Sequence, residues 1–207
     1  MNLPNKLTCL RMIMIPFFLF FLVSPEVLGF TASRIIGALL FGLTALTDML
    51  DGKIARKYNL VTDFGKFMDP LADKLMVFGA MFGILILNRE DPCLWALAEN
   101  TPAEIFNKVF VWCAFIIVFR ELAVTSMRMV VSSAEGIVIA ANIFGKMKTI
   151  SQIIGVIVII LEPILIANGV QTYLIASYVM CAVMVATTLF SGFSYFKAYW
   201  PHINSNK

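Results

Sequence analysis

Four aspartates with helical spacing are the residues of this sequence best placed to do chemistry. Asp48 and Asp51 are three residues apart, and Asp69 and Asp73 are four residues apart. In an α-helix either spacing places two side chains on one face, so two neighbouring helices could direct two carboxylates each towards a common point. Four converging carboxylates repel one another unless a positive charge compensates them.

A pair of divalent metal ions would supply that charge. Ligand sets made only of oxygen atoms favour hard cations, so Mg²⁺ or Mn²⁺ suits this cluster. Two ions about 4 Å apart are typical of sites that transfer phosphoryl groups. Alternatively, the acids could form an interfacial charge belt with the nearby bases Lys53, Arg56, Lys57, Lys66 and Lys74. The spacing alone leaves both interpretations open.

The helices that carry these acids are expected to cross a membrane. Of the 207 residues 60% are hydrophobic and 14% are charged, and the mean hydropathy of +0.87 lies outside the range of ordinary soluble domains. Apolar runs long enough to span a bilayer fall at roughly 10–30, 35–50, 71–87, 109–131, 150–168 and 172–196. The sequence therefore predicts an all-α integral membrane protein with six transmembrane helices in a single domain, residues 1–207.

The segments around these runs allow more detailed expectations. Residues 2–7, NLPNKL, predict a short N-terminal interfacial segment in which Pro4 breaks the helix, with Lys6 and Arg11 facing anionic lipid head groups. We expect the first run to be kept as a span, because it is longer than the apolar region of a typical signal peptide. Short connections are predicted near 30–34 and 168–171.

The distribution of basic residues predicts the orientation in the membrane. Thirteen of the sixteen Lys and Arg residues fall on the side of the two termini, and only Arg34, Arg89 and Lys108 fall on the other. Because basic residues concentrate in cytoplasmic loops, both termini and the aspartate cluster are expected at the cytoplasmic boundary. The single histidine, His202, lies in the polar tail, which argues against histidine-based catalysis. Membrane lipid is the expected partner, and no nucleic acid is expected.

The aspartates belong to a longer motif that resembles a known family. The pattern is Asp48-x-x-Asp51-Gly52-x-x-Ala55-Arg56, then eight residues, then Gly65-x-x-x-Asp69-x-x-x-Asp73. It is similar to the signature of the CDP-alcohol phosphotransferases, membrane enzymes that transfer a substituted phosphate from a CDP-linked donor to an alcohol. Segments 2–11, 119–128 and 145–152 resemble the bacterial phosphatidylglycerophosphate synthases of that family.

The resemblance implies roles for individual residues. Two divalent ions would bridge the donor pyrophosphate, held by Asp48, Asp51, Asp69 and Asp73, and Asp73 would also act as general base. Residues at the donor site would be Gly52, Ala55, Arg56 and Gly65, where the two small helix residues admit the nucleotide and the arginine binds a phosphate oxygen. Asn5 and Thr8 would lie at the rim of the nucleotide pocket, unless they only cap a helix at the interface.

Charge arithmetic favours a phosphorylated acceptor. Two divalent ions balance four carboxylates, so the negative charges of a donor pyrophosphate and of an acceptor phosphate need further cations. Candidate cations on the fourth and fifth spans are Arg120, Arg128, Lys146 and Lys148. For Arg120 the alternative is an internal charge balance with Glu121 or snorkelling to the interface. For Lys146 and Lys148 it is an ordinary excess of cytoplasmic charge.

The expected reaction is therefore transfer from CDP-diacylglycerol to glycerol 3-phosphate, giving phosphatidylglycerol phosphate and CMP. Within the family, the alternative acceptors are phosphatidylglycerol, which would give cardiolipin, and inositol phosphate. From other classes, the alternatives are a cation transporter and a non-catalytic membrane scaffold. Homodimerisation is typical of the family, and Gly79 and Gly83 form a GxxxG motif that could pack helices within one chain or between two.

Overall fold

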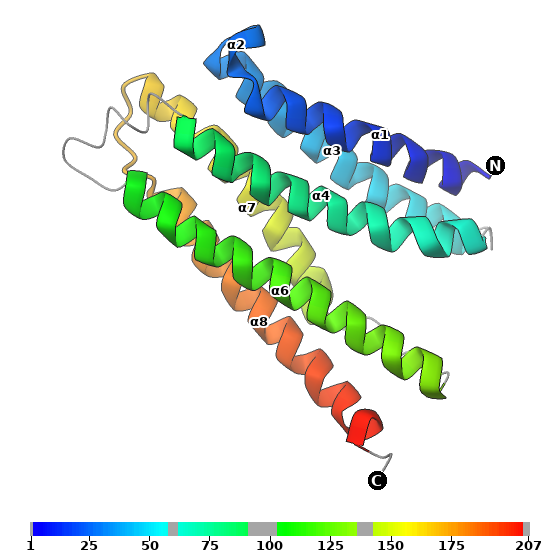
Figure 1. Cartoon of the computed structure of the whole chain (residues 1–207). Helices are drawn as coiled ribbons and strands as arrows, with labels where there is room; N and C mark the ends of the chain where they lie inside the picture. The colour runs from blue at the N-terminus through cyan, green and yellow to red at the C-terminus, as the bar shows by residue number, and fades with distance from the viewer. Residues whose placement is uncertain (1, 58–61, 91–102, 136–142, 205–207) are drawn as a thin grey trace.

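The computed structural model describes residues 2–57, 62–90, 103–135 and 143–204, and within them the chain is helical throughout apart from short connections. Figure 1 shows a bundle of long helices with no strand in the described ranges. The helices are α1 (Leu3–Val23), α2 (Pro25–Leu28), α3 (Phe30–Lys57), α4 (Asp63–Glu90), α6 (Ala103–Glu135), α7 (Ile143–Ala167) and α8 (Ile175–Asn204).

Six of these helices are long and apolar enough to cross a membrane. The apolar stretches are Asn5–Val23, Phe30–Asp48, Phe67–Leu87, Ile105–Ser132, Ile143–Ala167 and Ile175–Pro201. Each helix also exposes large apolar side chains, for example Phe17, Leu39, Phe82, Phe115, Ile150 and Phe193. Such a surface suits lipid rather than water, and the prediction of an all-α membrane protein with six spans is confirmed.

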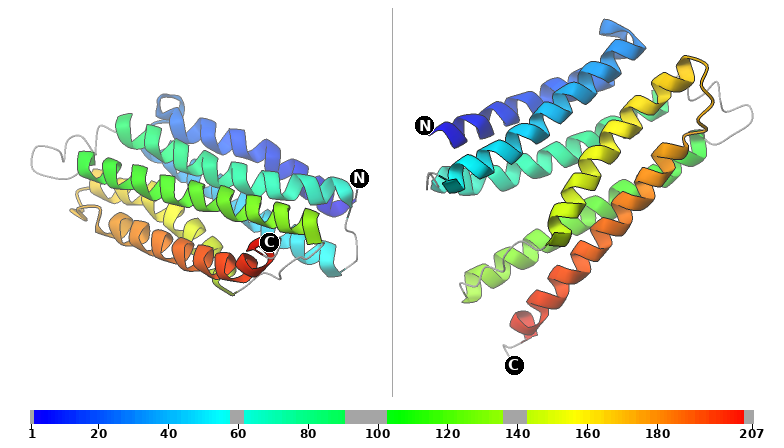
Figure 2. Two further views of the ribbon diagram at one scale, coloured as in Figure 1. Left: turned by 60° about the horizontal axis from the view of Figure 1, so that its bottom comes forward. Right: turned by 180° about the vertical axis from the view of Figure 1, so that it is seen from behind.

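The helices pack as two groups of three. In the first group α1 lies against α3 and α4, and in the second α8 lies against α6 and α7. Contacts of α3 with α7 and of α4 with α6 join the groups. Both ends of the chain lie at the same end of the bundle, and the two groups diverge towards that end (Figures 1 and 2).

Aromatic and aliphatic side chains fill the interior between the helices. Phe18 of α1 and Phe41 of α3 meet edge to face with ring centroids 5.6 Å apart. Phe106 of α6 meets Tyr178 of α8 in the same way at 5.1 Å. Within lipid, helices associate through close packing rather than through exclusion of water, so these interlocked contacts hold the site-bearing helices in place.

The GxxxG motif of α4 packs within the chain. A Cβ atom built on Gly83 would lie 2.8 Å from Leu22 Cδ2 and 2.9 Å from Leu19 Cδ1, both on α1. One built on Gly79 would lie 3.5 Å from the ring of Phe18. The two glycines therefore face α1 of the same chain. Of the two alternatives considered from the sequence, packing within one chain and packing between two chains, the structure has the first.

Two local expectations for the first helices were wrong. Pro4 lies in the first turn of α1, where a missing N–H is tolerated, so residues 3–11 continue directly into the span. The first connection lies at 24–29 rather than near 30–34, because Gly29 adopts a φ of 84° that ends the turn. The second connection, predicted near 168–171, precedes α8 as expected.

We expect Gly83→Val to lower the melting temperature of the purified protein in detergent. The added methyl groups would force α1 away from α4, and overpacking of this kind costs roughly 1–3 kcal/mol. Gly42→Val is the matched control, because a Cβ there meets only Ile157 Cδ1 at 3.9 Å. Equal melting temperatures for the two variants would contradict close packing at Gly83.

Candidate active site

The aspartates lie at the end of the bundle that carries both termini. Asp48 is near the C-terminal end of α3, whereas Asp69 and Asp73 lie in the first turns of α4. The side chains of Asp48 and Asp73 keep 30% and 52% of their surface exposed. Four further residues of the motif belong to α3, but their side chains lie outside the described part of the chain: Asp51, Gly52, Ala55 and Arg56.

A buried arginine of α1 joins the two aspartate-bearing helices. Arg11 Nη1 lies 2.7 Å from Asp48 Oδ1 and 2.8 Å from Asp73 Oδ1, and the arginine side chain is completely buried. Both carboxylate oxygens are therefore close neighbours around a single nitrogen atom. The expectation that Arg11 faces lipid head groups was wrong, because its charge is neutralised inside the protein by these acids.

The first turns of α1 also hold the third aspartate and the start of α4. Thr8 Oγ1 donates a hydrogen bond of 2.7 Å to Asp69 Oδ1. Thr62 caps α4, since its hydroxyl accepts the N–H of Gly65 at 3.1 Å and donates to Asn5 Oδ1 at 3.0 Å. Asn5 and Thr8 are both buried, so they contact Thr62 and Asp69 from the interior of the bundle.

The glycine of the motif keeps these groups together. A Cβ atom on Gly65 would lie 3.2 Å from Asn5 Oδ1 and 3.3 Å from Thr62 Oγ1. Any larger residue would press on the polar contact between the helices. Gly65 is therefore a point of close approach between α1 and the start of α4.

Arg11 and Thr62 are the residues of this cluster that sequence reasoning missed. A signal for Arg11 existed, because Asn5, Thr8 and Arg11 follow one another at intervals of three residues. That spacing places all three on one helix face. No comparable pattern marked Thr62, whose role depends on where α4 begins.

A second polar cluster lies in the other group of helices. Glu121 of α6 accepts hydrogen bonds from Lys148 of α7 and, at 3.3 Å, from Arg120 Nη1. Arg120 Nη2 donates to Ser191 Oγ of α8 at 2.6 Å, and its guanidinium lies 5.6 Å from the ring centre of Tyr195. The charge balance with Glu121 that we considered for Arg120 is present, and it also includes Lys148.

One charge interaction links the two clusters. It joins Lys148 to Asp73 and is weaker than the interactions of Lys148 with Glu121 and Arg120. Arg120, Glu121 and Lys148 are all largely buried, with 9%, 14% and 11% of their side-chain surface exposed, and together carry one net positive charge. Of the other predicted cations, Arg128 and Lys146 are exposed on α6 and α7.

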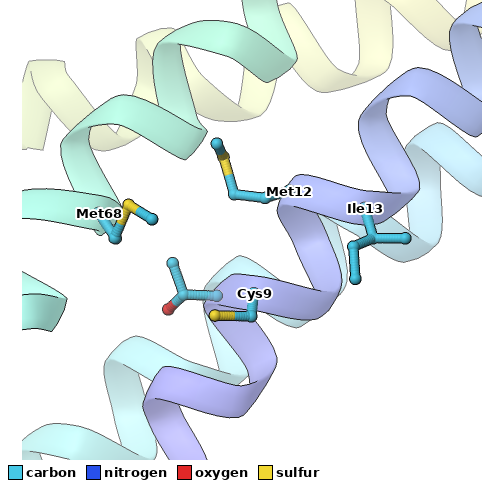
Figure 3. Close-up of a pocket in the computed structure, with 5 residues that line it drawn as sticks. Cys9, Met12, Ile13 and Met68 are labelled. Carbon is cyan, nitrogen blue, oxygen red and sulfur yellow. The ribbon is translucent and has the colours of Figure 1, made fainter.

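An apolar hollow adjoins the aspartate cluster between α1 and α4. It is lined by Thr8, Cys9, Met12, Ile13 and Met68 and has a volume of about 280 Å³. Figure 3 shows Met68 of α4 facing Cys9 and Met12 of α1 across this space. Because Thr8 both lines the hollow and bonds to Asp69, an apolar group bound in the hollow would lie beside the carboxylates.

The donor set suits a hard divalent cation. Three of the four predicted ligands, Asp48, Asp69 and Asp73, offer only carboxylate oxygens, which Mg²⁺ and Mn²⁺ prefer. Among the described side chains, no three acidic, histidine or cysteine groups gather closely enough to form a metal site by themselves. The side chain of Asp51, the remaining predicted ligand, lies outside that set.

Known proteins are similar to this chain over almost its whole length. The model of the CDP-alcohol phosphatidyltransferase family matches residues 1–190. A Bacillus subtilis protein named CDP-diacylglycerol–glycerol-3-phosphate 3-phosphatidyltransferase is 36% identical, with 99% of this chain and 98% of that protein covered. A Rickettsia bellii protein of the same name is 34% identical, with 95% and 94% covered. A Mycobacterium tuberculosis protein named probable phosphatidylglycerophosphate synthase is 30% identical, with 94% and 79% covered.

We expect Glu121→Gln to destabilise the protein markedly. The change leaves two buried cations without their shared counter-charge, and breaking a buried ion pair in this way costs about 3–5 kcal/mol. Thermal unfolding in detergent measures the effect. Lys146→Gln is the control, because loss of an exposed charge changes stability by no more than about 0.5 kcal/mol. Similar unfolding of the two variants would show that Glu121 does not balance this cluster.

Proposed function

This chain belongs to the CDP-alcohol phosphatidyltransferase family, and we propose that it transfers the phosphatidyl group of CDP-diacylglycerol to glycerol 3-phosphate, giving phosphatidylglycerol phosphate and CMP. It is a membrane-bound phosphatidyltransferase. The observation that carries the proposal is the meeting of Asp48 and Asp73, from two helices, at one end of the bundle. The similarity to named relatives over nearly the full chain supports the choice of substrates.

We propose that the four aspartates hold two divalent ions, Mg²⁺ or Mn²⁺. Asp48, Asp69 and Asp73 lie at the same end of the bundle, and Asp51 follows Asp48 on the next turn of α3. When bound, the ions would neutralise the donor pyrophosphate and the CMP that leaves. Arg11 and Thr8 would keep the carboxylates in place for this task, since they already contact three of the four.

The proposed reaction is a direct displacement. A hydroxyl oxygen of glycerol 3-phosphate attacks the phosphorus atom that carries the lipid, the bond from that phosphorus to the CMP oxygen breaks, and the hydroxyl proton passes to Asp73. The partly exposed carboxylate of Asp73 suits proton transfer to solvent afterwards. Because one displacement moves the group directly to the acceptor, no covalent enzyme intermediate is required.

The second cluster is proposed to bind the phosphate of the acceptor. Arg120 and Lys148 supply buried donors, and the charge interaction of Lys148 with Asp73 supports a role for this cation beside the reacting groups. Arg128 and Lys146 are exposed on the same two helices and would attract the anion from solution. An acceptor with no phosphate would leave the buried cations without a ligand, which favours glycerol 3-phosphate over neutral alcohols.

The donor would lie along α1 and α3. We propose that the apolar hollow beside Thr8 receives part of an acyl chain, because it is lined mainly by apolar side chains. Gly52, Ala55 and Arg56 would contact the nucleotide and its phosphates. Asn5 and Gly65 would act by fixing the start of α4 through Thr62, and Thr8 by orienting Asp69.

The protein is a multi-pass membrane protein, and its relatives are bacterial. We propose that it resides in the bacterial cell membrane with both termini and the site on the cytoplasmic side, where most of its basic residues fall. We also propose that the protein forms a homodimer, because homodimers are typical of the family. Its contact would not be the GxxxG motif, because Gly79 and Gly83 are covered by α1.

Purified protein with CDP-diacylglycerol and Mg²⁺ or Mn²⁺ should release CMP only when glycerol 3-phosphate is added. The physical reason is that the buried cations require an anionic acceptor to complete the site. Release of CMP, measured with a panel of acceptors, tests this directly. Faster turnover with inositol phosphate or with phosphatidylglycerol would transfer the assignment to another member of the family, and no release with any acceptor would favour a transporter or scaffold.

Asp69→Asn and Asp73→Asn should each lower the rate of CMP release by at least about 100-fold. Either change removes a negative charge and a ligand oxygen while keeping the shape of the side chain, so the protein should remain folded in detergent. Glu26→Gln, an exposed carboxylate of α2 at the opposite end of the bundle, should retain the parent rate. Activity of the aspartate variants within a few fold of the parent would rule out the metal-binding role.

A further inference from the structure

We propose that Arg11 is the internal counter-ion of the aspartate site and that it shares its carboxylates with the divalent cations. This inference rests on the proposed metal-dependent transfer reaction and adds a positioning residue to it. Arg11 belongs to α1, whereas the proposed metal ligands belong to α3 and α4. A residue outside the aspartate motif would then determine how much bound metal stabilises the fold.

The contacts of Arg11 are unusual for a basic residue near the end of a membrane span. Such residues normally extend to the interface and keep the charged group in water. The side chain of Arg11 has no exposed surface, and its Nη1 atom lies within 2.8 Å of oxygens from both Asp48 and Asp73. A guanidinium remains charged at any relevant pH, so the two acids face a permanent positive charge.

The neighbouring carboxylates explain why a cation is needed at this position. Asp48 of α3 and Asp73 of α4 meet at Arg11, and Asp69 lies one turn before Asp73 on α4. With no cation between them, like charges on the two helices would repel and push the helices apart. Arg11 removes part of this repulsion within the protein itself.

A divalent cation would neutralise the same carboxylates. Two effects that act through shared groups are not additive, and a double-mutant cycle measures the difference. When Arg11 is present, part of the repulsion is already relieved, so added metal stabilises the fold less. When Arg11 is replaced by a neutral residue, the metal has more repulsion to relieve and stabilises the fold more.

Arg34 provides a matched control for this cycle. It is buried like Arg11, with 1% of its surface exposed. Its Nη1 donates to the carbonyl of Ile160 at 2.8 Å, and its guanidinium lies 4.6 Å from the ring centre of Phe30. Because Arg34 lies in the first turns of α3, at the opposite end from Asp48, its loss should affect stability without changing the response to metal.

The experiment measures melting temperatures of the purified full-length chain in detergent, with EDTA and with saturating Mn²⁺, for the parent, Arg11→Gln and Arg34→Gln. In EDTA, Arg11→Gln should melt about 5 °C or more below the parent. Mn²⁺ should raise the melting temperature of Arg11→Gln more than that of the parent. Arg34→Gln should also melt early, but with the same Mn²⁺-induced rise as the parent.

A second variant and a second readout cover the case in which Arg11→Gln does not fold. Arg11→Lys keeps the charge but loses the planar fork, so its Mn²⁺-induced rise should exceed that of the parent by a smaller margin. The dissociation constant for Mn²⁺, followed by electron paramagnetic resonance, should fall severalfold in whichever variant is used, because larger stabilisation at equal metal concentration requires tighter binding.

The outcomes separate the two proposals. Equal Mn²⁺-induced rises in the parent and the Arg11 variants would overturn the role of Arg11 and leave the metal site intact. An absence of any rise in the parent would overturn the metal site and, with it, this inference. A larger rise in the Arg34 variant, equal to that of Arg11→Gln, would show that the effect follows from general destabilisation rather than from shared carboxylates.

Discussion

Repulsion between carboxylates is the constraint on which the arrangement of the first three spans depends. Asp48 and Asp73 approach each other because Arg11 lies between them, and Arg11 reaches them only because α1 packs closely against α4. That approach requires Gly83, since a Cβ atom there would lie within 2.9 Å of side chains of α1. Packing deep in the membrane and charge balance at its surface are therefore parts of one arrangement, and the inferred reaction depends on both.

The other three spans, α6, α7 and α8, bury cations rather than carboxylates, and these cations also need compensation. Glu121 compensates Arg120 and Lys148, while Ser191 accepts a further hydrogen bond from Arg120. The balance is incomplete, since two cations face one carboxylate. An anionic acceptor would complete it, whereas the donor and its ions would be bound by the first group of helices. On the proposed function, each substrate would bind to one half of the bundle, and the charge interaction of Lys148 with Asp73 would link the two halves.

Much of this could be predicted from the sequence, because hydropathy and spacing are local signals. The six spans followed from runs of apolar residues, and the aspartates from intervals of three and four. The position of Arg11 could not be obtained in this way, since a basic residue near a span end usually lies at the interface and only the packing of α1 places it inside. Pro4 was misjudged because proline both ends helices and begins them. The pairing of Lys148 with Glu121 depends on how α6 and α7 meet, which no local pattern encodes.

The divergence of the two helix groups towards the end with both termini has a geometric consequence (Figure 2). When one rigid group of helices rotates against another, atoms far from the rotation axis move further than atoms near it. If one helix group tilts against the other, the helix ends where the groups are close change little, whereas the ends near the two termini move most. The proposed chemistry would thus lie where a small tilt of one helix group against the other has its greatest effect on the distance between their side chains.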